Sequence, residues 1–476
     1  MTPSPLRHRP PSSSRARRTA RAFALVASLA LAAALPGCGR GARAPLLLLV
    51  TVDTLRADHL GAYGSDLGAT PRIDALASQS VAFDAAFAPA SYTLPSMASL
   101  HTGLYPEEVG IFANRSAFRG SSVTVAEMLR IAGWRTGAAV SNYVLRGGTG
   151  MEIGFDVYDD AFTTSERNRD QPERTAEATT AAALAVLDAL RASPHAGLFL
   201  WVHYQDVHGP YEPPAGLRER YLARARATRN GSRTLPTGGI NAMGAIPSYQ
   251  VVDGRDDAAF YLAGYAGEVA FVDAQIGALL DGVDARGLLD DARVVFTADH
   301  GESLGEDDYW FAHGELLSDA LVRVPLLVRA PGLAPGRRAD VASMVDLLPT
   351  LAGLAGLPLP ARSAGRDLLA AGADRAPARA YLATLMGAST QRWGWVEDGH
   401  VLVRTDLGGG RVRDELRSLD RGAGGAAASA GGDDALRRRM GDELARFREE
   451  LDVADAAWQE LGPQDRAMLE RLGYAH

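Results

Sequence analysis

The stretch Leu46-Leu47-Leu48-Leu49-Val50-Thr51-Val52-Asp53 decides the fold, because an uninterrupted apolar and β-branched run ends in a carboxylate. Such a run, without polar alternation, is typical of a strand that is buried on both faces of a parallel sheet. Three more runs of strand length follow at residues 198–203, 294–297 and 324–328, and helical patterns separate them. This alternation predicts an α/β fold, in which a large mixed, mostly parallel sheet is sandwiched by helices.

The spacing of apolar residues predicts four helices, at residues 71–80, 123–132, 175–192 and 257–282. Residues 217–249 begin rich in Arg and become rich in Gly, Pro and Ser. We interpret them as a surface insertion over a functional site. The composition shifts to Ala, Gly and Pro at residues 371–379, which indicates a domain boundary. We therefore expect a catalytic domain over residues 44–372.

Beyond that boundary, residues 378–476 are expected to form a small C-terminal α+β subdomain with a helical tail. Its expected elements are short antiparallel strands at 380–385, 391–397 and 400–405, a mobile Gly/Ala-rich stretch at 408–432, and a helix at 434–451.

Residues 1–37 are expected to form a signal peptide rather than part of the fold. Six arginines precede the apolar residues 22–35, a run too short to span a membrane comfortably as a helix. The sequence Leu35-Pro36-Gly37-Cys38-Gly39 resembles a bacterial lipobox, which implies that Cys38 is lipidated and becomes the mature N-terminus. An ordinary signal peptide and an uncleaved anchor are the alternatives. The lipoprotein interpretation predicts export to the bacterial cell envelope and attachment to a membrane, at the periplasmic face or the outer surface, through the lipid.

Charge and composition argue against several classes of partner and site. The 49 basic residues are all Arg, and the net charge of −8 becomes −14 when residues 1–37, with six arginines and no acid, are removed. This balance argues against nucleic acid as a partner, because phosphate binding needs a basic face. Cys38 is the single cysteine, so an internal disulfide and a cysteine metal site are excluded. Nothing in the sequence indicates an oligomeric state.

Polar residues that can do chemistry follow three of the four predicted strands. Asp53 ends the first, Asp206 and His208 follow the second, and Asp299 with His300 ends the third. Because ligands in open α/β sheets bind beyond the carboxyl ends of the strands, we expect these residues to converge. The alternative for Asp53 is the common role of a carboxylate that caps a helix or turn.

The segment Thr93-Leu94-Pro95-Ser96-Met97 resembles the nucleophile motif of the sulfatase family, within the alkaline-phosphatase superfamily. Sulfatases there have Cys or Ser followed by x-Pro-Ser-Arg, and the Cys or Ser is oxidised to formylglycine. Here Thr93 stands at the oxidised position and Met97 at that of the Arg. A secondary alcohol cannot become that aldehyde, so we expect no formylglycine. Pro95 suits the first turn of a helix, which predicts Thr93 just before a helix N-terminus; a mere N-cap is the alternative.

Two further segments resemble the metal-binding motifs of the superfamily. Asp53-Thr54 stands where Asp-Asp is common, and Asp299-His300-Gly301 is similar to the second metal segment of phosphate-handling members. The resemblance implies one divalent metal ion on Asp53, Thr93, Asp299 and His300. A set with both Asp and His suits Zn²⁺ or Mn²⁺ better than Ca²⁺. A cation there would lower the pKa of the Thr93 hydroxyl and make it a nucleophile.

The residues that would face the substrate are also taken from the resemblance. His208 lies in a stretch similar to the family's His-x-Pro region and is the candidate acid for the leaving group, with Asp206 orienting it. His313 lies in the late His-Gly and faces substrate. Asn142 follows the stretch that matches the family's Lys-x-His segment, so it contacts a substrate oxygen or is a buried structural residue. Binding of a second metal by His208 and His313 is the alternative that we do not favour.

The resemblance covers about residues 45–370, yet the formylglycine, the adjacent Arg and the two Lys of sulfatases are missing. With less fixed positive charge, a singly charged diester suits the site better than a dianionic monoester. We therefore expect a metal-dependent ester hydrolase that acts on a phosphodiester or phosphonate ester, either a small molecule or an envelope component. The alternatives are sulfuric ester hydrolysis by an unmodified hydroxyl, and a catalytically degenerate envelope binding protein.

Overall fold

The computed structural model describes residues 44–114, 116–118, 122–166, 168, 172–239, 242–360, 362–370, 378–384, 390–419, 433–451 and 453. The predicted signal peptide, Cys38, most of the predicted domain boundary and residues 420–432 therefore lie outside the described residues. From residue 44 onward the chain forms one compact unit. Among the described helices, none has the length and apolar character needed to cross a membrane.

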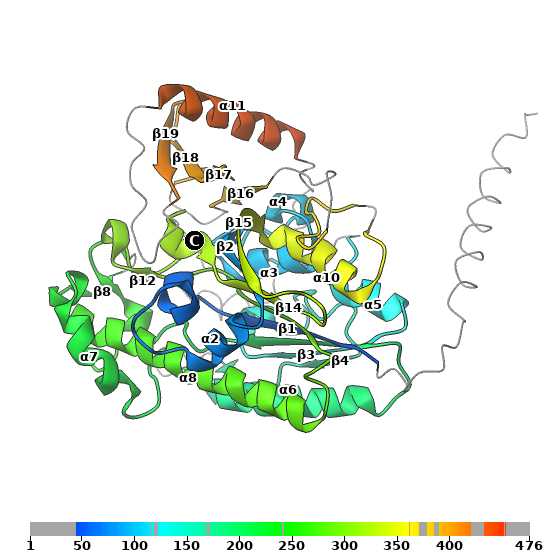
Figure 1. Ribbon diagram of the computed structural model, residues 1–476. Coiled ribbons are helices and arrows are strands. Elements are labelled where there is room, and N and C mark those ends of the chain that lie inside the picture. The colour runs from blue at the N-terminus through cyan, green and yellow to red at the C-terminus, as the bar shows by residue number, and fades with distance from the viewer. Residues whose placement is uncertain are drawn as a thin grey trace, which may run out of the picture. The chain divides into compact units, whose positions relative to one another are not determined.

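A mixed sheet, with nine strands among the described residues, lies at the centre of the fold (Figure 1). Its order is β13-β2-β14-β10-β1-β7-β3-β4, and β15 pairs with β2. The pairs among β10, β1, β7, β3 and β4 are parallel, and β13 and β14 pair antiparallel with their neighbours. The strands are β1 (Leu46–Val52), β2 (Val81–Phe87), β3 (Arg135–Val140), β4 (Val157–Asp159), β7 (Leu198–Tyr204), β10 (Arg293–Ala298), β13 (Arg323–Val324), β14 (Leu326–Arg329) and β15 (Gly336–Ser343).

The two faces of the sheet are covered by two groups of helices (Figure 1). One group packs around the long helix α8: α2 (Pro71–Ala77), α6 (Ala176–Arg191), α7 (Leu217–Ala227) and α8 (Ala258–Ala285). The other group is α3 (Thr93–Thr102), α5 (Val125–Ile131) and α10 (Leu347–Ala355). The predicted α/β class, with a mostly parallel sheet between helices, is confirmed.

Strand β1 determines where the site lies. All seven of its residues are buried, and it pairs in parallel with β10 on one side and β7 on the other. Val52 is opposite Ala298 and Tyr204 in this register. The residues that follow the three strands therefore emerge at the same edge of the sheet.

Three local predictions differ from the structure. Residues 324–328 are two strands, because Pro325 has no N–H to continue the ladder. The insertion at residues 217–249 begins with a helix, α7, which packs against α8. The stretch predicted as mobile at 408–432 contains strand β19, whose alternating charged residues resemble a loop but pair with β18.

The C-terminal residues form a separate four-stranded antiparallel sheet, crossed by helix α11 (Asp434–Glu450). Its strands are β16 (Arg379–Ala383), β17 (Arg392–Glu397), β18 (His400–Asp406) and β19 (Val412–Ser418). Met440 and Leu444 of α11 share a buried cluster with Trp395 of the sheet and with Ala90 and Tyr105 of the larger part. The remaining short elements are α4 (Pro106–Val109), α9 (Asp319–Val322), β5 (Thr164–Ser165), β6 (Pro172–Glu173), β8 (Thr237–Gly239), β9 (Ile246–Pro247), β11 (Ser303–Leu304) and β12 (Trp310–Ala312).

Replacement of Leu49 by Ala is expected to lower the free energy of unfolding by about 3 kcal/mol, because a fully buried side chain of the central strand is lost. Urea denaturation measures the change. Leu359→Ala, at a leucine that is 54% exposed, is the matched control and should change the free energy little. Equal effects of the two substitutions would show that β1 is not the centre of the core.

Candidate active site

Asp53, Asp299 and His300 form a compact, fully buried cluster at the carboxyl ends of β1 and β10. One ligand atom from each lies within 4.8 Å of the other two. His300 Nε2 is 3.9 Å from Asp53 Oδ1 and 3.5 Å from Asp299 Oδ2. Such a set of two carboxylate oxygens and one imidazole nitrogen matches the ligands of Zn²⁺ and Mn²⁺.

Hydrogen bonds to neighbouring groups fix the orientation of the three side chains in this cluster. His300 Nδ1 is 2.9 Å from the Gly301 carbonyl, which can only accept, so Nε2 keeps its lone pair. Asp299 Oδ1 accepts from the backbone N–H groups of Thr54 and His300, at 3.1 and 2.7 Å. Asp53 Oδ2 accepts from the Asn142 side chain.

Asp53 Oδ1 and Asp299 Oδ2 are left without a hydrogen-bond partner in the described part of the chain, although both are buried. Burial raises the pKa of Asp53 to about 7, and burial together with the Asp53 charge raises the pKa of Asp299 to about 6. Burial lowers the pKa of His300 to about 4, so its ring is neutral. Unpaired buried carboxylates beside a neutral imidazole fit a divalent cation.

Thr93 lies against this cluster. It is the first residue of helix α3, it is fully buried, and its Oγ1 is 3.4 Å from His300 Nε2. The N-cap position belongs to Tyr92, so Thr93 stands one residue further into the helix than predicted and does not cap it. The hydroxyl therefore faces the candidate metal ligands at a helix N-terminus, where negative charge is stabilised.

His313 lies beside His300, with 4.5 Å between the ring centroids. Its Nδ1 is 3.0 Å from Glu302 Oε1, and the other oxygen of Glu302 accepts from Tyr211 Oη at 2.9 Å. Glu302 is fully buried, and burial raises its pKa to about 8. Glu302 and His313 Nδ1 share a proton in this contact, which leaves Nε2 of His313 to exchange protons with a substrate.

The other three residues predicted to face the substrate are His208, Asp206 and Asn142. His208 Nδ1 bonds the Gly209 carbonyl at 2.8 Å rather than Asp206, and the His208 ring centroid lies 5.3 Å from that of His313. The predicted role of Asp206 in orienting His208 therefore has no support in this geometry. Asn142 donates to Asp53 and accepts from the Val144 N–H at 2.8 Å. Of its two predicted roles, these bonds fit that of a buried structural residue.

Three side chains with a place in the site were not singled out from the sequence. Glu302 stands in the Asp-His-Gly segment but was given no role. His203, at the end of β7, bonds Thr51 Oγ1 at 2.9 Å and has Nε2 3.8 Å from Asp53 Oδ2. Asn114 accepts from the N–H of Leu94, the residue after Thr93, at 2.9 Å and has a buried Nδ2 without a partner among the described residues. The position of His203 at the end of a predicted strand could have indicated its place in the site. No feature of the sequence indicates Asn114, because only the fold brings it to α3.

Among the residues that the structure describes, fixed positive charge near the cluster is limited. Met97, at the position of the family's Arg, is fully buried in the apolar core. Arg56 forms ion pairs with Asp58 and Glu306, both at 2.8 Å, so these two carboxylates balance its charge. The site therefore relies on its candidate cation and on neutral donors to bind a negatively charged ester.

Comparison with known proteins gives the family. The sulfatase family model matches residues 45–357. The chain belongs to the sulfatase family. It is similar to iduronate 2-sulfatase of Homo sapiens, at 27% identity over 66% of this chain and 70% of that protein. It is also similar to arylsulfatase A of Bos taurus, at 30% identity over 70% of this chain and 68% of that protein.

A solved structure shares the fold. The phosphonate monoester hydrolase of Agrobacterium radiobacter aligns with a TM-score of 0.66 and 20% identity, over 88% of this chain and 98% of that one. The family predicted from the Thr93 and Asp299-His300 segments is confirmed, and this chain is a sulfatase-family hydrolase.

Added Zn²⁺ or Mn²⁺ is expected to raise the melting temperature of the metal-free protein strongly at pH 8 and weakly at pH 5. The pKa of Asp53 rises from 3.8 to about 7 by burial, so the metal-free fold loses stability as the pH rises through this range, and protons displace the cation below it. Thermal unfolding with and without metal from pH 5 to pH 8 measures this.

Asp53→Asn should abolish the metal effect, and Asp284→Asn, at an exposed position on α8, should retain it. A rise in melting temperature that is independent of pH, or that survives in Asp53→Asn, would place the cation elsewhere.

Proposed function

We propose that this chain is a metal-dependent phosphodiester or phosphonate ester hydrolase, with the unmodified Thr93 hydroxyl as nucleophile. The observation that carries the proposal is the position of Thr93 Oγ1, 3.4 Å from His300 Nε2 and beside the unpaired oxygens of Asp53 and Asp299. The motif position holds Thr, whose secondary alcohol cannot give the formylglycine aldehyde.

The protein groups can carry a two-step substitution. Asp53, Asp299, His300 and Thr93 would hold one divalent cation, which supplies a lowered pKa for the Thr93 hydroxyl and offsets charge on the ester. Thr93 loses its proton to solvent, and its Oγ1 bonds to phosphorus as the bond from phosphorus to the leaving oxygen breaks. Water then cleaves the phosphorylated Thr93 and restores the hydroxyl.

His313 is the proposed acid for the leaving oxygen. His313 starts as an imidazolium whose Nδ1–H donates to an ionised Glu302. Its Nε2–H gives its proton to the leaving oxygen in the first step, and the neutral Nε2 takes a proton from the attacking water in the second. His208, whose ring lies next to that of His313, would contact the leaving group. Asn114 Nδ2, which has no partner among the described residues, would donate to a phosphoryl oxygen without adding charge.

The limited positive charge supports a singly charged substrate. A diester carries one negative charge, which one cation and neutral donors can balance. A monoester dianion needs more positive charge in the site. The structural likeness to a phosphonate monoester hydrolase supports the same substrate class. Sulfate esters are the second candidate, because the similar curated proteins are named as sulfatases.

The place of action is proposed from the N-terminal sequence. The Arg-rich start, the apolar residues 22–35 and the Cys38 segment support export and lipid attachment at Cys38 in a bacterial envelope. Labelling of expressing cells with an alkynyl fatty acid would test this, since the wild type should be labelled and a Cys38→Ala variant should not. A labelled Cys38→Ala variant would refute attachment at this residue.

Hydrolysis of bis-p-nitrophenyl phosphate, compared with p-nitrophenyl sulfate, tests the proposal. The full-length chain, stripped of metal and reconstituted with Zn²⁺, Mn²⁺ or Ca²⁺, is expected to cleave the diester and not the sulfate. Preferential cleavage of the sulfate would overturn the proposed substrate class. No cleavage of either ester with any of the ions would favour a binding protein.

Thr93→Ala is expected to lower kcat on the diester by at least about 1,000-fold, because the nucleophile is removed, while the metal content stays near that of the wild type. Elemental analysis of the purified variants measures the metal. Ser78→Ala, which removes an exposed hydroxyl at the end of α2, is the control. Retained diesterase activity in Thr93→Ala would rule out Thr93 as the nucleophile.

Glu302→Gln and His313→Ala are expected to slow diesters with alkyl leaving groups by about 100-fold or more, and p-nitrophenyl diesters much less. A p-nitrophenolate leaves without a proton, whereas an alkoxide needs one. The kcat values for a methyl and a p-nitrophenyl leaving group measure the difference, and His400→Ala in the C-terminal sheet is the control. An equal loss on both leaving groups would mean that His313 is not the acid.

A further inference from the structure

His203 is a buried histidine to which the proposed reaction gives no task. It lies near the end of β7, its side chain is fully buried, and its Nε2 has no hydrogen-bond partner among the described residues. That nitrogen is 3.8 Å from Asp53 Oδ2, so the ring stands next to a candidate metal ligand. A ring nitrogen that is buried without a partner is costly, which raises the question of what it does there.

A series of hydrogen bonds leads to the other nitrogen of the His203 ring. Trp201 Nε1 is 2.9 Å from Thr51 Oγ1, and the indole N–H can only donate. Thr51 Oγ1 is in turn 2.9 Å from His203 Nδ1 and 3.4 Å from the Val202 carbonyl. The shorter of these two contacts favours donation of the hydroxyl proton to Nδ1. We call the side chains of Trp201, Thr51 and His203 the hydrogen-bond relay.

The hydrogen-bond relay decides which ring nitrogen of His203 carries the proton. Burial lowers the pKa of His203 to about 4, so the ring is neutral and has a single N–H. Because Nδ1 accepts from Thr51, that proton is on Nε2 and faces the Asp53 carboxylate. The opposite tautomer would turn the lone pair of Nε2 toward a carboxylate oxygen, and the two would repel each other in a buried place.

The register of the sheet brings the hydrogen-bond relay together. Thr51 of β1 is opposite His203 of β7 in a parallel pair. Trp201 lies two residues before His203, so both side chains are on the same face of the sheet. The rings of His101 and Phe155 cover the Trp201 indole, with ring centroids 4.4 and 5.9 Å away. Strand pairing and ring packing therefore hold the donor and both acceptors in place.

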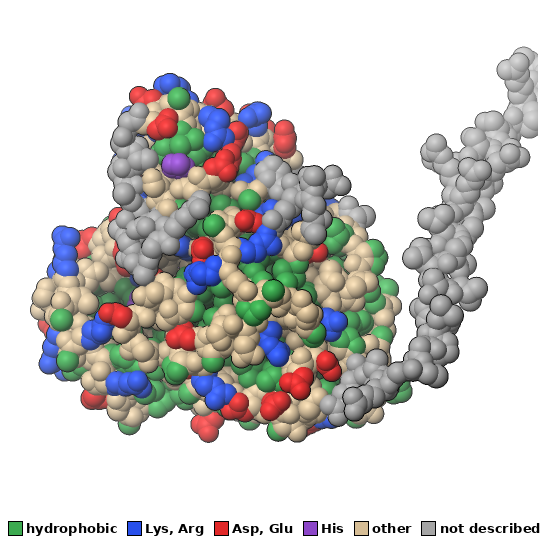
Figure 2. All heavy atoms as spheres, in the orientation of Figure 1, with side chains coloured by type: hydrophobic (Ala, Val, Ile, Leu, Met, Phe, Trp, Pro, Cys, Tyr) green, Lys and Arg blue, Asp and Glu red, His purple; other side chains and the backbone are tan. Residues whose placement is uncertain are grey.

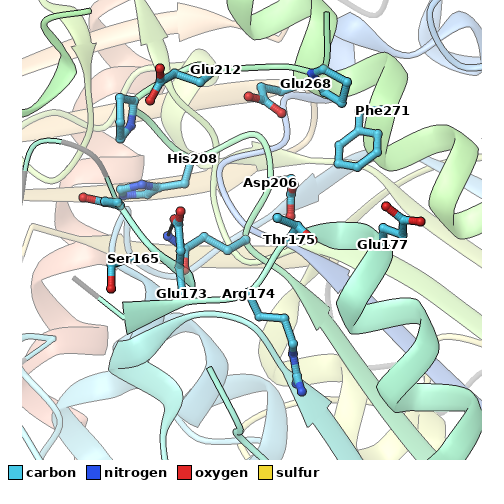
Figure 3. Close-up of a pocket in the computed structure, with 14 residues that line it drawn as sticks. Ser165, Glu173, Arg174, Thr175, Glu177, Asp206, His208, Glu212, Glu268 and Phe271 are labelled. Atoms are coloured by element: carbon cyan, nitrogen blue, oxygen red, sulfur yellow. Dashed lines mark hydrogen bonds between the residues drawn. The ribbon is translucent and has the colours of Figure 1, made fainter. Parts of the chain in front are cut away.

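The hydrogen-bond relay lies beneath the surface of the molecule. Charged side chains of both signs are scattered over the face seen in Figure 2, whereas Thr51, Trp201 and His203 are fully buried. A cavity of about 410 Å³ begins only further along the chain, where Asp206 and His208 line it (Figure 3). The side chains of the relay do not belong to that lining. Solvent therefore does not compete for the hydrogen bonds that fix the His203 proton.

His203 and Asn142 face the same oxygen of Asp53. Asn142 donates to Asp53 Oδ2, and the Nε2–H of His203 faces that oxygen from 3.8 Å. The other oxygen, Oδ1, is 3.9 Å from His300 Nε2 and is left for the cation. Among the described residues, the candidate ligand atoms within 4.8 Å of one another belong to Asp53, Asp299 and His300. His203 therefore acts through Asp53 rather than as a ligand.

We propose that His203 is a positioning residue of the metal site: the hydrogen-bond relay keeps its proton on Nε2, and this N–H directs Oδ1 of Asp53 toward the cation. The inference rests on the proposed function, because it concerns the metal site on which that function depends. His203 exchanges no proton with the substrate, and Thr51 and Trp201 act only by fixing its tautomer.

The first test compares the Zn²⁺ affinity of metal-free, full-length variants by competition with a chromophoric chelator. Thr51→Val keeps the shape of the side chain but removes its hydroxyl, and is expected to weaken Zn²⁺ binding by about tenfold or more. His203→Leu should do the same, whereas His203→Gln, which keeps a side-chain N–H, should regain most of the affinity. Thr136→Val is the matched control, because it removes an equally buried, hydrogen-bonded hydroxyl from β3 and should change nothing.

Equal Zn²⁺ affinity of the wild type, Thr51→Val and His203→Leu would overturn the inference and leave the proposed function standing. An equal loss in Thr136→Val would also overturn it, since the loss would then follow from a less stable fold. Failure of His203→Gln to bind more tightly than His203→Leu would show that the N–H is not what matters.

The second test determines the His203 tautomer in the metal-free protein. Correlation spectra of ¹⁵N-histidine-labelled protein, with the His203 signals assigned from His203→Gln, are expected to show the proton on Nε2, and this preference should weaken in Thr51→Val. A proton on Nδ1 in the wild type would overturn the inference. Absence of Zn²⁺ binding in the wild type would refute the metal-dependent function, and the tautomer then decides alone whether His203 directs its proton to Asp53.

Discussion

The rest of the site depends on two buried carboxylates that face each other where the central strands end. Asp53 and Asp299 are both fully buried, and each has one oxygen without a partner in the described residues. Two such charges in a water-poor place are unfavourable unless they are protonated or balanced by a cation. Strand β1 brings the buried charge about, because both its faces are buried and Asp53 follows directly where the strand ends. His300 and Thr93 complete the group around this charge.

A hydrogen bond at Nδ1 orients each of three imidazole rings around the cluster of Asp53, Asp299 and His300. Nδ1 bonds a carbonyl in His300 and His208 and a carboxylate in His313, and each bond leaves Nε2 as the working atom. The neighbours nevertheless give the rings different tasks. His300 lies between the two carboxylates of the candidate metal cluster, whereas His313 bonds Glu302 and is the group to which we assign proton transfer. The architecture is thus able to separate ion binding from proton transfer within a short distance.

The sequence predicted the parts of this arrangement that depend on strand ends. An apolar run followed by a carboxylate is a local pattern, so Asp53 and Asp299 could be placed before the structure was known, and the α/β class followed from the repetition of such runs. Contacts made by distant loops were not predictable in this way. Asn142 was interpreted partly as a substrate ligand, yet it holds Asp53 across 89 positions of the chain. Strand β19 was missed because its charged, alternating residues resemble a loop until β18 supplies the partner.

The central claim is that Thr93 itself bonds to phosphorus. Acid quenching of the metal-reconstituted enzyme during turnover of bis-p-nitrophenyl phosphate, followed by tandem mass spectrometry of the peptide that contains Thr93, tests it most directly. The account predicts a p-nitrophenyl phosphoryl group on Thr93 that is absent without substrate and absent at position 93 of the Thr93→Ala enzyme. An unmodified Thr93 throughout turnover, or a phosphoryl group on another residue, would contradict the account.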